Sequence, residues 1–212
     1  MIKILNRLSL LVSFAVILIS SASFGQFKAT SSKKMAQIET ISFPQSTGYS
    51  LDYLKANFWR LNYSSAGPAL AYRIVVPVKM RPTNVKPTTV RDIGITLIGE
   101  YQIIDKTMPY LEVQVAYEKV SNVHPDIKSW FNEKLKKLKG TLRAKAAINI
   151  AGKNGYDVLF TRTLKSGEQY ITRASMLVAG DNYVMVTAMS SKADYDKSAK
   201  TIYHILSNWN MQ

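Results

Sequence analysis

Cysteine is absent from this 212-residue chain, so disulfide bonds and thiol catalysis are excluded. Histidine is scarce, with only His124 and His204. Zinc sites usually gather three or four His, Cys or carboxylate ligands, and no spacing of that kind occurs. A Gly-x-Ser-x-Gly motif is missing, and residues 151–155 (AGKNG) resemble a phosphate-binding loop too loosely to favour one over a hairpin turn. We therefore expect no metal, no cofactor and no catalytic residue.

Acidic residues are also missing from the start of the chain, where Glu39 is the first. Lys3 and Arg7 precede an apolar run over residues 8–19, and small residues follow at 20–23 and 25. This order is typical of an export signal peptide, residues 1–25, with Ser23 and Gly25 at the −3 and −1 positions of the cleavage site. Cleavage after Ala22 is the alternative.

An uncleaved membrane anchor is the other interpretation of this segment. The apolar run is shorter than the roughly 20 residues that span a bilayer, which favours cleavage. Removing residues 1–25 takes away two basic residues and leaves 26 basic against 14 acidic, a formal charge of +12. A positive charge of this size favours binding to an anionic partner, either an acidic protein or an anionic membrane surface. Nucleic acid is not expected, because export separates the chain from most of it.

The remaining residues fit one domain, 49–212, preceded by a flexible basic arm, 26–48. Ser50 suits a helix N-cap, and Leu51, Leu54, Phe58 and Leu61 at helical spacing predict a helix over about 51–62. Period-two alternation then predicts strands over about 72–78, 92–104 and 111–118. In the last of these, Glu112 and Glu118 are expected to face solvent.

A second helix is predicted from Pro125 and Asp126 to Gly140, with its apolar face formed by residues such as Trp130 and Phe131. Strands are predicted at about 156–163, 169–178 and 183–189, with a first one beginning at 146–150. A last helix is predicted over 194–209. Strands in hairpin-connected runs with helices packed on them indicate an α+β fold, an antiparallel sheet in an α-β-α sandwich.

The C-terminal half resembles the PsbP-like and DcrB-like superfamily of small exported α-β-α sandwich domains. The resemblance is carried by residues 156–160, 167–177 and 182–188 and by the closing helix from Tyr195 to Trp209, and it extends over about 70–210. It implies a PsbP-like sheet and a mostly non-enzymatic role, such as a subunit of a membrane complex or a small binding protein. It carries over no functional residue, and the helix at 51–62 departs from its pattern.

A basic cluster is the strongest candidate for a binding surface. Its six members fall within a dozen residues: Lys134, Lys136, Lys137, Lys139, Arg143 and Lys145. One interpretation is a solvated helix face, which the helix dipole favours near a C-terminus. The other is a docking surface for an anionic partner, with salt-sensitive contacts that are individually weak.

Aromatic residues are concentrated around the first predicted helix. Trp59 and Tyr63 do not share the stripe of Leu51, Phe58 and Leu61, so we expect them to be either packed beneath the N-terminal segment or exposed as a second contact surface.

The hypothesis that follows is an exported, periplasmic or outer-envelope protein that serves as a binding or structural subunit of a cell-envelope assembly. A secretion system is one such assembly. The alternative is a periplasmic carrier of a lipid or small apolar ligand, and a hydrolase that pairs carboxylates in space ranks last. The oligomeric state and the identity of the partner stay open.

Overall fold

A computed structural model describes residues 41–84, 86–164 and 166–212, which belong to one compact unit, Thr40–Gln212. The expected signal peptide and residues 26–40 of the expected arm lie outside the described residues. Within the described part of the chain, no helix has the length and apolar character needed to cross a bilayer.

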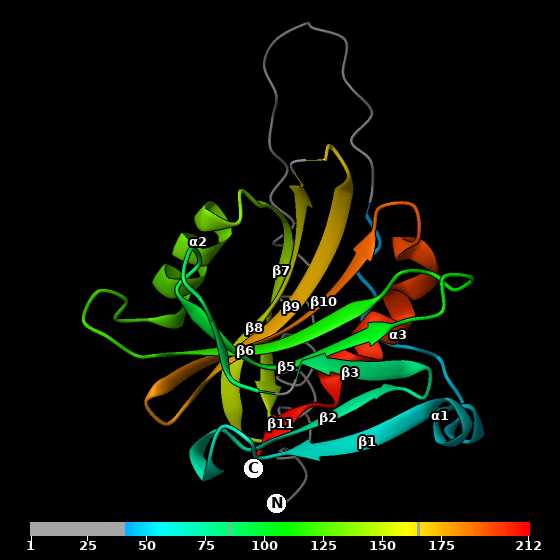
Figure 1. Cartoon of the computed structure of the whole chain (residues 1–212), viewed down its shortest axis with the longest axis horizontal. Helices are drawn as coiled ribbons and strands as arrows, with labels where there is room; N and C mark the ends of the chain where they lie inside the picture. Colours follow the sequence, from blue (N-terminus) through cyan, green and yellow to red (C-terminus); the bar gives the residue numbers. More distant parts are fainter. Residues whose placement is uncertain (1–40, 85, 165) are drawn as a thin grey trace, which may run out of the picture. The chain divides into compact units, whose positions relative to one another are not determined.

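Three helices and eleven strands make up the unit (Figure 1). The helices are α1 (Leu51–Asn57), α2 (Ile127–Lys137) and α3 (Tyr195–Ser207), with a short 3-10 turn, η1, at Pro68–Leu70. The strands are β1 (Phe58–Tyr63), β2 (Tyr72–Pro77), β3 (Met80–Asn84), β4 (Thr88–Val90), β5 (Ile95–Ile103), β6 (Glu112–Lys119), β7 (Thr141–Ile150), β8 (Lys153–Thr163), β9 (Gln169–Ala179), β10 (Asn182–Ser191) and β11 (Asn210–Met211).

All strand pairs are antiparallel. The larger sheet has the order β3-β5-β6-β10-β9-β8-β7, with β4 also paired to β5. A smaller sheet has the order β1-β2-β11. Helix α3 and the small sheet lie on one face of the large sheet, and α2 lies on the other (Figure 1). The predicted α+β sandwich on an antiparallel sheet is therefore confirmed.

Side chains that alternate along the strands of the large sheet contribute to two separate hydrophobic cores, one on each face. On the α3 face, alternate residues of β6, β9 and β10, such as Val113, Leu177 and Val186, pack against α3 and β2. On the α2 face, the intervening residues, such as Met176 and Met185, pack against α2. Because both faces are covered, the central strands read as nearly continuous apolar runs rather than as half-exposed ones.

The first predicted helix is wrong beyond residue 57. Ser50 caps α1 as expected, accepting a hydrogen bond from the Tyr53 backbone N–H at 3.2 Å. The chain then continues as β1, and Phe58–Tyr63 pairs residue by residue with β2. Leu61 and Tyr63 also alternate at the period of a strand, and in β1 both pack against the core and are partly buried, which overrides the helical spacing.

Two further expectations are corrected by burial. Residues 41–48, expected to be a loose arm, are attached to the core, where Ile41 and Phe43 pack against the α3-side cluster. Glu112 and Glu118 were expected to face solvent, but Glu112 is 8% exposed and Glu118 accepts a hydrogen bond from Trp130 Nε1 at 2.8 Å. Both expectations were wrong for the same reason: the pattern of one segment does not reveal which other parts of the chain pack against it.

Gly99 provides a test of the packing between the two sheets. An added Cβ there would lie 2.0 Å from the hydroxyl oxygen of Tyr72, which is buried and 2.8 Å from the Tyr101 hydroxyl. We expect Gly99→Ala to lower the free energy of unfolding by about 1–3 kcal/mol, as overpacking does. In a Tyr72→Phe background the loss should be smaller, because the clashing oxygen is gone. Urea denaturation of the four proteins in this double-mutant cycle measures the difference, and equal losses in both backgrounds would contradict the packing.

Candidate functional site

The predicted basic cluster divides into one internal lysine and five exposed cations. Lys136, Lys137, Lys139, Arg143 and Lys145 are exposed on the last turn of α2 and the first half of β7. Lys128 on α2 joins them, because its charge acts on Lys145. We call this surface the basic strip: Lys128, Lys136, Lys137, Lys139, Arg143 and Lys145.

Lys134 does not belong to the strip. Its side chain is 2% exposed, forms an ion pair with Glu118 of β6 and lies 3.0 Å from Glu133. Its ammonium also donates to the Ile93 backbone carbonyl at 3.1 Å. Lys134 follows Trp130 and Phe131 by one helical turn, so it shares their buried face. Both interpretations of the basic cluster took Lys134 to be exposed, and for this residue they are wrong.

Glu133 is the hub of this internal charge group. It forms ion pairs with Lys134 and Lys137, at 3.0 and 2.5 Å, and it lies 2.9 Å from His124 Nε2. Burial raises the pKa of the Glu133 carboxyl, but hydrogen bonds and charges from Lys137 and Lys134 outweigh it and lower the pKa to about 2. Because Glu133 is paired with Lys134 and Lys137, the other strip cations keep their charge available to a partner.

Two members of the strip have local contacts that fix their direction. The Lys145 ammonium lies 3.6 Å from the ring centroid of Tyr156, and burial together with the Lys128 charge lowers the pKa of Lys145. Arg143 Nε donates to Thr161 Oγ1 at 3.1 Å. These contacts leave both side chains exposed along β7, which ends the order of the large sheet.

The predicted aromatic residues lie elsewhere, on β1 of the small sheet, on the other face of the large sheet from α2 (Figure 1). Tyr63 packs against the core and stacks on Tyr72 with ring centroids 5.7 Å apart. Trp59 is 46% exposed, with the Arg81 guanidinium 5.2 Å from its ring centroid. The structure therefore does not join Trp59 and Tyr63 to the basic strip.

A second feature, which the sequence analysis missed, is a buried ion pair on the α3 face. Arg173 of β9 is fully buried, and Asp157 of β8 is 6% exposed. Arg173 Nε donates to the two carboxylate oxygens at 3.0 and 3.2 Å, and a terminal nitrogen donates to one of them at 2.5 Å. The signal was present as two charged residues in adjacent, otherwise apolar predicted strands.

The same guanidinium holds the N-terminal segment. Its other terminal nitrogen donates to the Pro44 carbonyl at 2.6 Å, and its carbon lies 4.1 Å from the Phe43 ring centroid. Tyr195 adds a hydrogen bond from its hydroxyl to the Ser42 carbonyl at 2.9 Å. Residues 42–44 are thus bound to β9 and α3 by groups that are themselves buried, and we call these contacts the arginine clamp.

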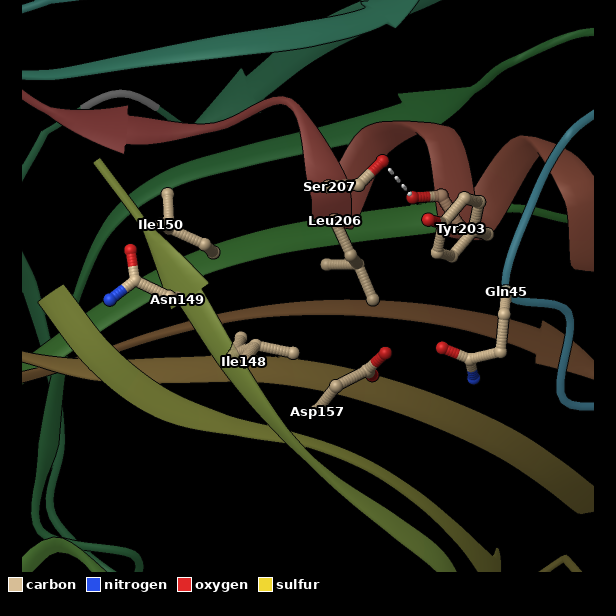
Figure 2. A pocket seen from close by; sticks show the side chains of 8 residues that line it. All are labelled: Gln45, Ile148, Asn149, Ile150, Asp157, Tyr203, Leu206 and Ser207. Atoms are coloured by element: carbon tan, nitrogen blue, oxygen red, sulfur yellow. Dashed lines mark hydrogen bonds between the residues drawn. The ribbon is translucent and has the colours of Figure 1, made fainter. Parts of the chain in front are cut away.

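A pocket of about 200 Å³ opens beside the clamp, between the end of α3 and strands β7 and β8 (Figure 2). Asp157 points into it from β8, Ile148 from β7, Tyr203 and Leu206 from α3, and Gln45 from the N-terminal segment (Figure 2). The Asp157 carboxylate is committed to Arg173, and the Ser207 hydroxyl donates to the Tyr203 carbonyl at 2.8 Å. These polar groups are therefore occupied in holding the fold together.

The two histidines take structural positions. His124 contacts Glu133, as described above, and His204 lies on α3 with its ring centroid 4.6 Å from that of Phe58. Burial lowers the pKa of His204. Within residues 41–84, 86–164 and 166–212, no three His, Asp or Glu side chains are grouped as metal ligands.

Comparison with known proteins identifies the type of fold. No protein-family model and no curated protein matches the sequence. Among solved structures, the cyanobacterial PsbP (CyanoP) of Synechocystis sp. PCC 6803 matches with a TM-score of 0.52 and 11% identity, over 74% of this chain and 94% of that one. LpqN, involved in cell envelope biogenesis of Mycobacterium tuberculosis, matches with a TM-score of 0.49 and 12% identity, over 76% and 96%. The chain has a PsbP-like fold, as the sequence resemblance predicted.

The arginine clamp predicts how the stability of the protein changes when its charged groups are replaced. Arg173→Met should leave the Asp157 carboxylate buried without its partner and lower the free energy of unfolding by about 3–5 kcal/mol. A double variant, Arg173→Met with Asp157→Leu, should recover much of that loss, since no charge is then left uncompensated. Chemical denaturation measures both. Limited proteolysis should cut within residues 41–49 faster in either variant, and unchanged cleavage would contradict the clamp.

Glu133 predicts a pH dependence. A carboxyl whose pKa is lowered by folding stabilises the protein above its unfolded pKa, near the ordinary value of 4.5, and this contribution is lost as the pH falls toward about 2. Glu133→Gln should therefore cost about 1–3 kcal/mol at pH 7, and the difference from the parent should shrink between pH 4.5 and 2. Urea denaturation across that range measures it, and a pH-independent difference would show that the charge of Glu133 is irrelevant.

Proposed function

We propose that this chain is an exported, non-enzymatic binding subunit of a cell-envelope assembly and that it docks on an acidic protein surface through the basic strip. A periplasmic location follows from this proposal and is supported by the signal-like order of residues 1–25. A secretion system is one class of assembly that would use such a subunit.

The observation that carries the proposal is the separation of charges around α2. The nearby carboxylates Glu118 and Glu133 are bound by Lys134 and Trp130 on the inner side of the helix. The strip cations lie on the outer side, and of these only Lys137 contacts Glu133. The helix has one i,i+4 pair, Glu133–Lys137, whereas Lys136, Lys139, Arg143 and Lys145 form no ion pair with a described residue, so the strip keeps an excess of positive charge.

The position of the strip suits docking rather than catalysis. It runs along α2 and onto β7, which pack on and belong to the large sheet, so its cations are presented from a rigid platform. Six cations that each contribute little at ordinary ionic strength together give an association that weakens as salt is added. Binding of this kind needs no activated side chain.

A lipid carrier is supported less well by the cavities. Among the pockets lined by described residues, three beside α3 have volumes of about 200, 260 and 270 Å³, and one on the α2 face has about 150 Å³. Pockets that enclose a drug-sized ligand usually measure about 300–1,000 Å³. A small polar ligand fits these volumes better than an acyl chain does.

The test is affinity purification of the tagged protein from crosslinked cell envelopes, with mass spectrometry of what is recovered. The strip variant carries Lys136→Glu, Lys139→Glu, Arg143→Glu and Lys145→Glu. Lys137 is left in place because it pairs with Glu133. The matched control reverses four exposed lysines elsewhere and changes the net charge equally: Lys55→Glu, Lys86→Glu, Lys106→Glu and Lys200→Glu.

We expect the parent and the control to recover the same set of envelope proteins, and the strip variant to lose at least about tenfold of that recovery, since several ionic contacts are reversed together. Recovery that is equal for the strip variant and the parent would refute docking through the strip. Loss of recovery in both variants would mean that net charge, rather than this surface, governs the association.

A further inference from the structure

The α2 face of the large sheet contains a cavity of about 150 Å³ whose lining includes no residue of the basic strip or of the arginine clamp. Strands β5, β6, β8, β9 and β10 contribute to its walls, and Leu138 closes it at the end of α2. This volume is large enough to hold ordered water or a small molecule.

One wall of the cavity is apolar. It is formed by residues that continue the α2-side core, among them Ile95, Leu97, Leu138, Phe160 and Met185. A wall of this kind favours an apolar group and gives water few partners, so it suits the hydrocarbon part of a ligand.

The rest of the lining, on the same face of the sheet as Phe160, contains two polar groups without hydrogen-bond partners among the described residues. Thr172 is 4% exposed, and its Oγ1 makes no hydrogen bond with any described residue. Arg162 Nε is likewise buried and makes no hydrogen bond with any described residue, and one terminal nitrogen of the same guanidinium donates to the Met189 sulfur at 2.6 Å. Buried polar groups are nearly always hydrogen-bonded, and a thioether is a weak acceptor. A hydroxyl and a guanidinium that line one cavity are together a site for a carboxylate.

A carboxylate of the protein lines the same cavity. Glu112 is 8% exposed and accepts hydrogen bonds from the Tyr110 hydroxyl, from Gln114 Nε2 at 2.6 Å and from Gln102 Nε2 at 3.2 Å. A carboxylate offers about four acceptor positions, so three donors leave one for a ligand. Its charge also disfavours a simple anion in the cavity, just as Arg162 disfavours a simple cation.

We propose that this cavity binds a small zwitterion with an apolar side group, of the size and chemistry of a free apolar amino acid. The carboxylate of the ligand pairs with Arg162 and Thr172, its ammonium with Glu112, and its side group lies against Phe160 and Leu138. Each charged wall then has the opposite charge of the ligand before it, and the two unpaired groups are satisfied. This site is independent of the docking role of the basic strip.

The experiment is a titration of the isotopically labelled mature protein with L-leucine, L-methionine and L-phenylalanine, followed by backbone amide NMR. We expect shifts confined to residues around the cavity, with a Kd at or below about 1 mM. N-acetyl-leucine lacks the ammonium and leucinamide lacks the carboxylate, so each should bind roughly tenfold more weakly or not at all.

Two variants test the assignment of the polar wall. Thr172→Val keeps the shape of the side chain and removes the hydroxyl, and it should weaken binding roughly five- to tenfold. Arg162→Met should abolish it. Thr163→Val, at the exposed end of β8, is the matched control and should leave the affinity unchanged. If Arg162→Met does not fold, the Thr172 variant and the two leucine analogues still decide the matter.

Three outcomes would overturn the proposal. One is the absence of any shift up to several times the expected Kd, which would mean that the cavity holds water only. Another is binding that Thr172→Val leaves unchanged. The third is binding of N-acetyl-leucine or leucinamide as tight as that of leucine, since the two charged walls would then have no role.

Discussion

A buried guanidinium on the α3 face of the sheet is the constraint on which the attachment of the N-terminal segment depends. Taking the charge of Arg173 out of water is costly unless it is paired, and the partners that pair it come from two distant parts of the chain. Asp157 supplies the counter-charge from the neighbouring strand, and the Pro44 carbonyl supplies an acceptor from the segment before α1. Residues 42–44 are therefore part of the folded domain, because the Pro44 carbonyl accepts a hydrogen bond from the buried Arg173 guanidinium.

The two faces of the sheet use charge in different ways. On the α3 face, the charges of Arg173 and Asp157 are compensated within the protein, and the adjoining pocket is bounded by side chains already engaged in structural hydrogen bonds. On the α2 face, Lys134 and Glu133 neutralise each other, the strip cations are exposed, and the Thr172 hydroxyl and Arg162 Nε have no hydrogen-bond partner among the described residues. The α2 face is accordingly the one on which both binding proposals lie.

Sequence reasoning predicted the fold and most of its elements because strand and helix periods are strong where burial is strong. The α2 helix, the meander β8–β9–β10 and the closing helix all appear close to their predicted bounds. Sequence reasoning failed where the same apolar residues fit both the helical period and the strand period. Leu61 belongs to a helical stripe and to a strand alternation alike, and only the presence of β2 decides between them.

The candidate site was predicted in part for a similar reason. The run of cations after Glu133 identified the strip, but the sequence could not separate Lys134 from its neighbours, because its burial depends on Glu118 of a strand sixteen residues earlier. Glu112, Arg162 and Thr172 come from three different strands, and their convergence on one cavity is a property of the register alone. The spacing of these three residues along the chain does not predict such a site.

The central claim, that the basic strip is the docking surface, is tested most directly by the reactivity of individual lysines. The protein would be treated with an amine-acetylating reagent in intact envelopes and again after purification, and the modification of each lysine compared by mass spectrometry. The account predicts that Lys136, Lys139 and Lys145 react much less in the envelope than in the purified protein, whereas Lys55, Lys86, Lys106 and Lys200 react equally in both. Equal reactivity of the strip lysines in the two preparations would contradict it.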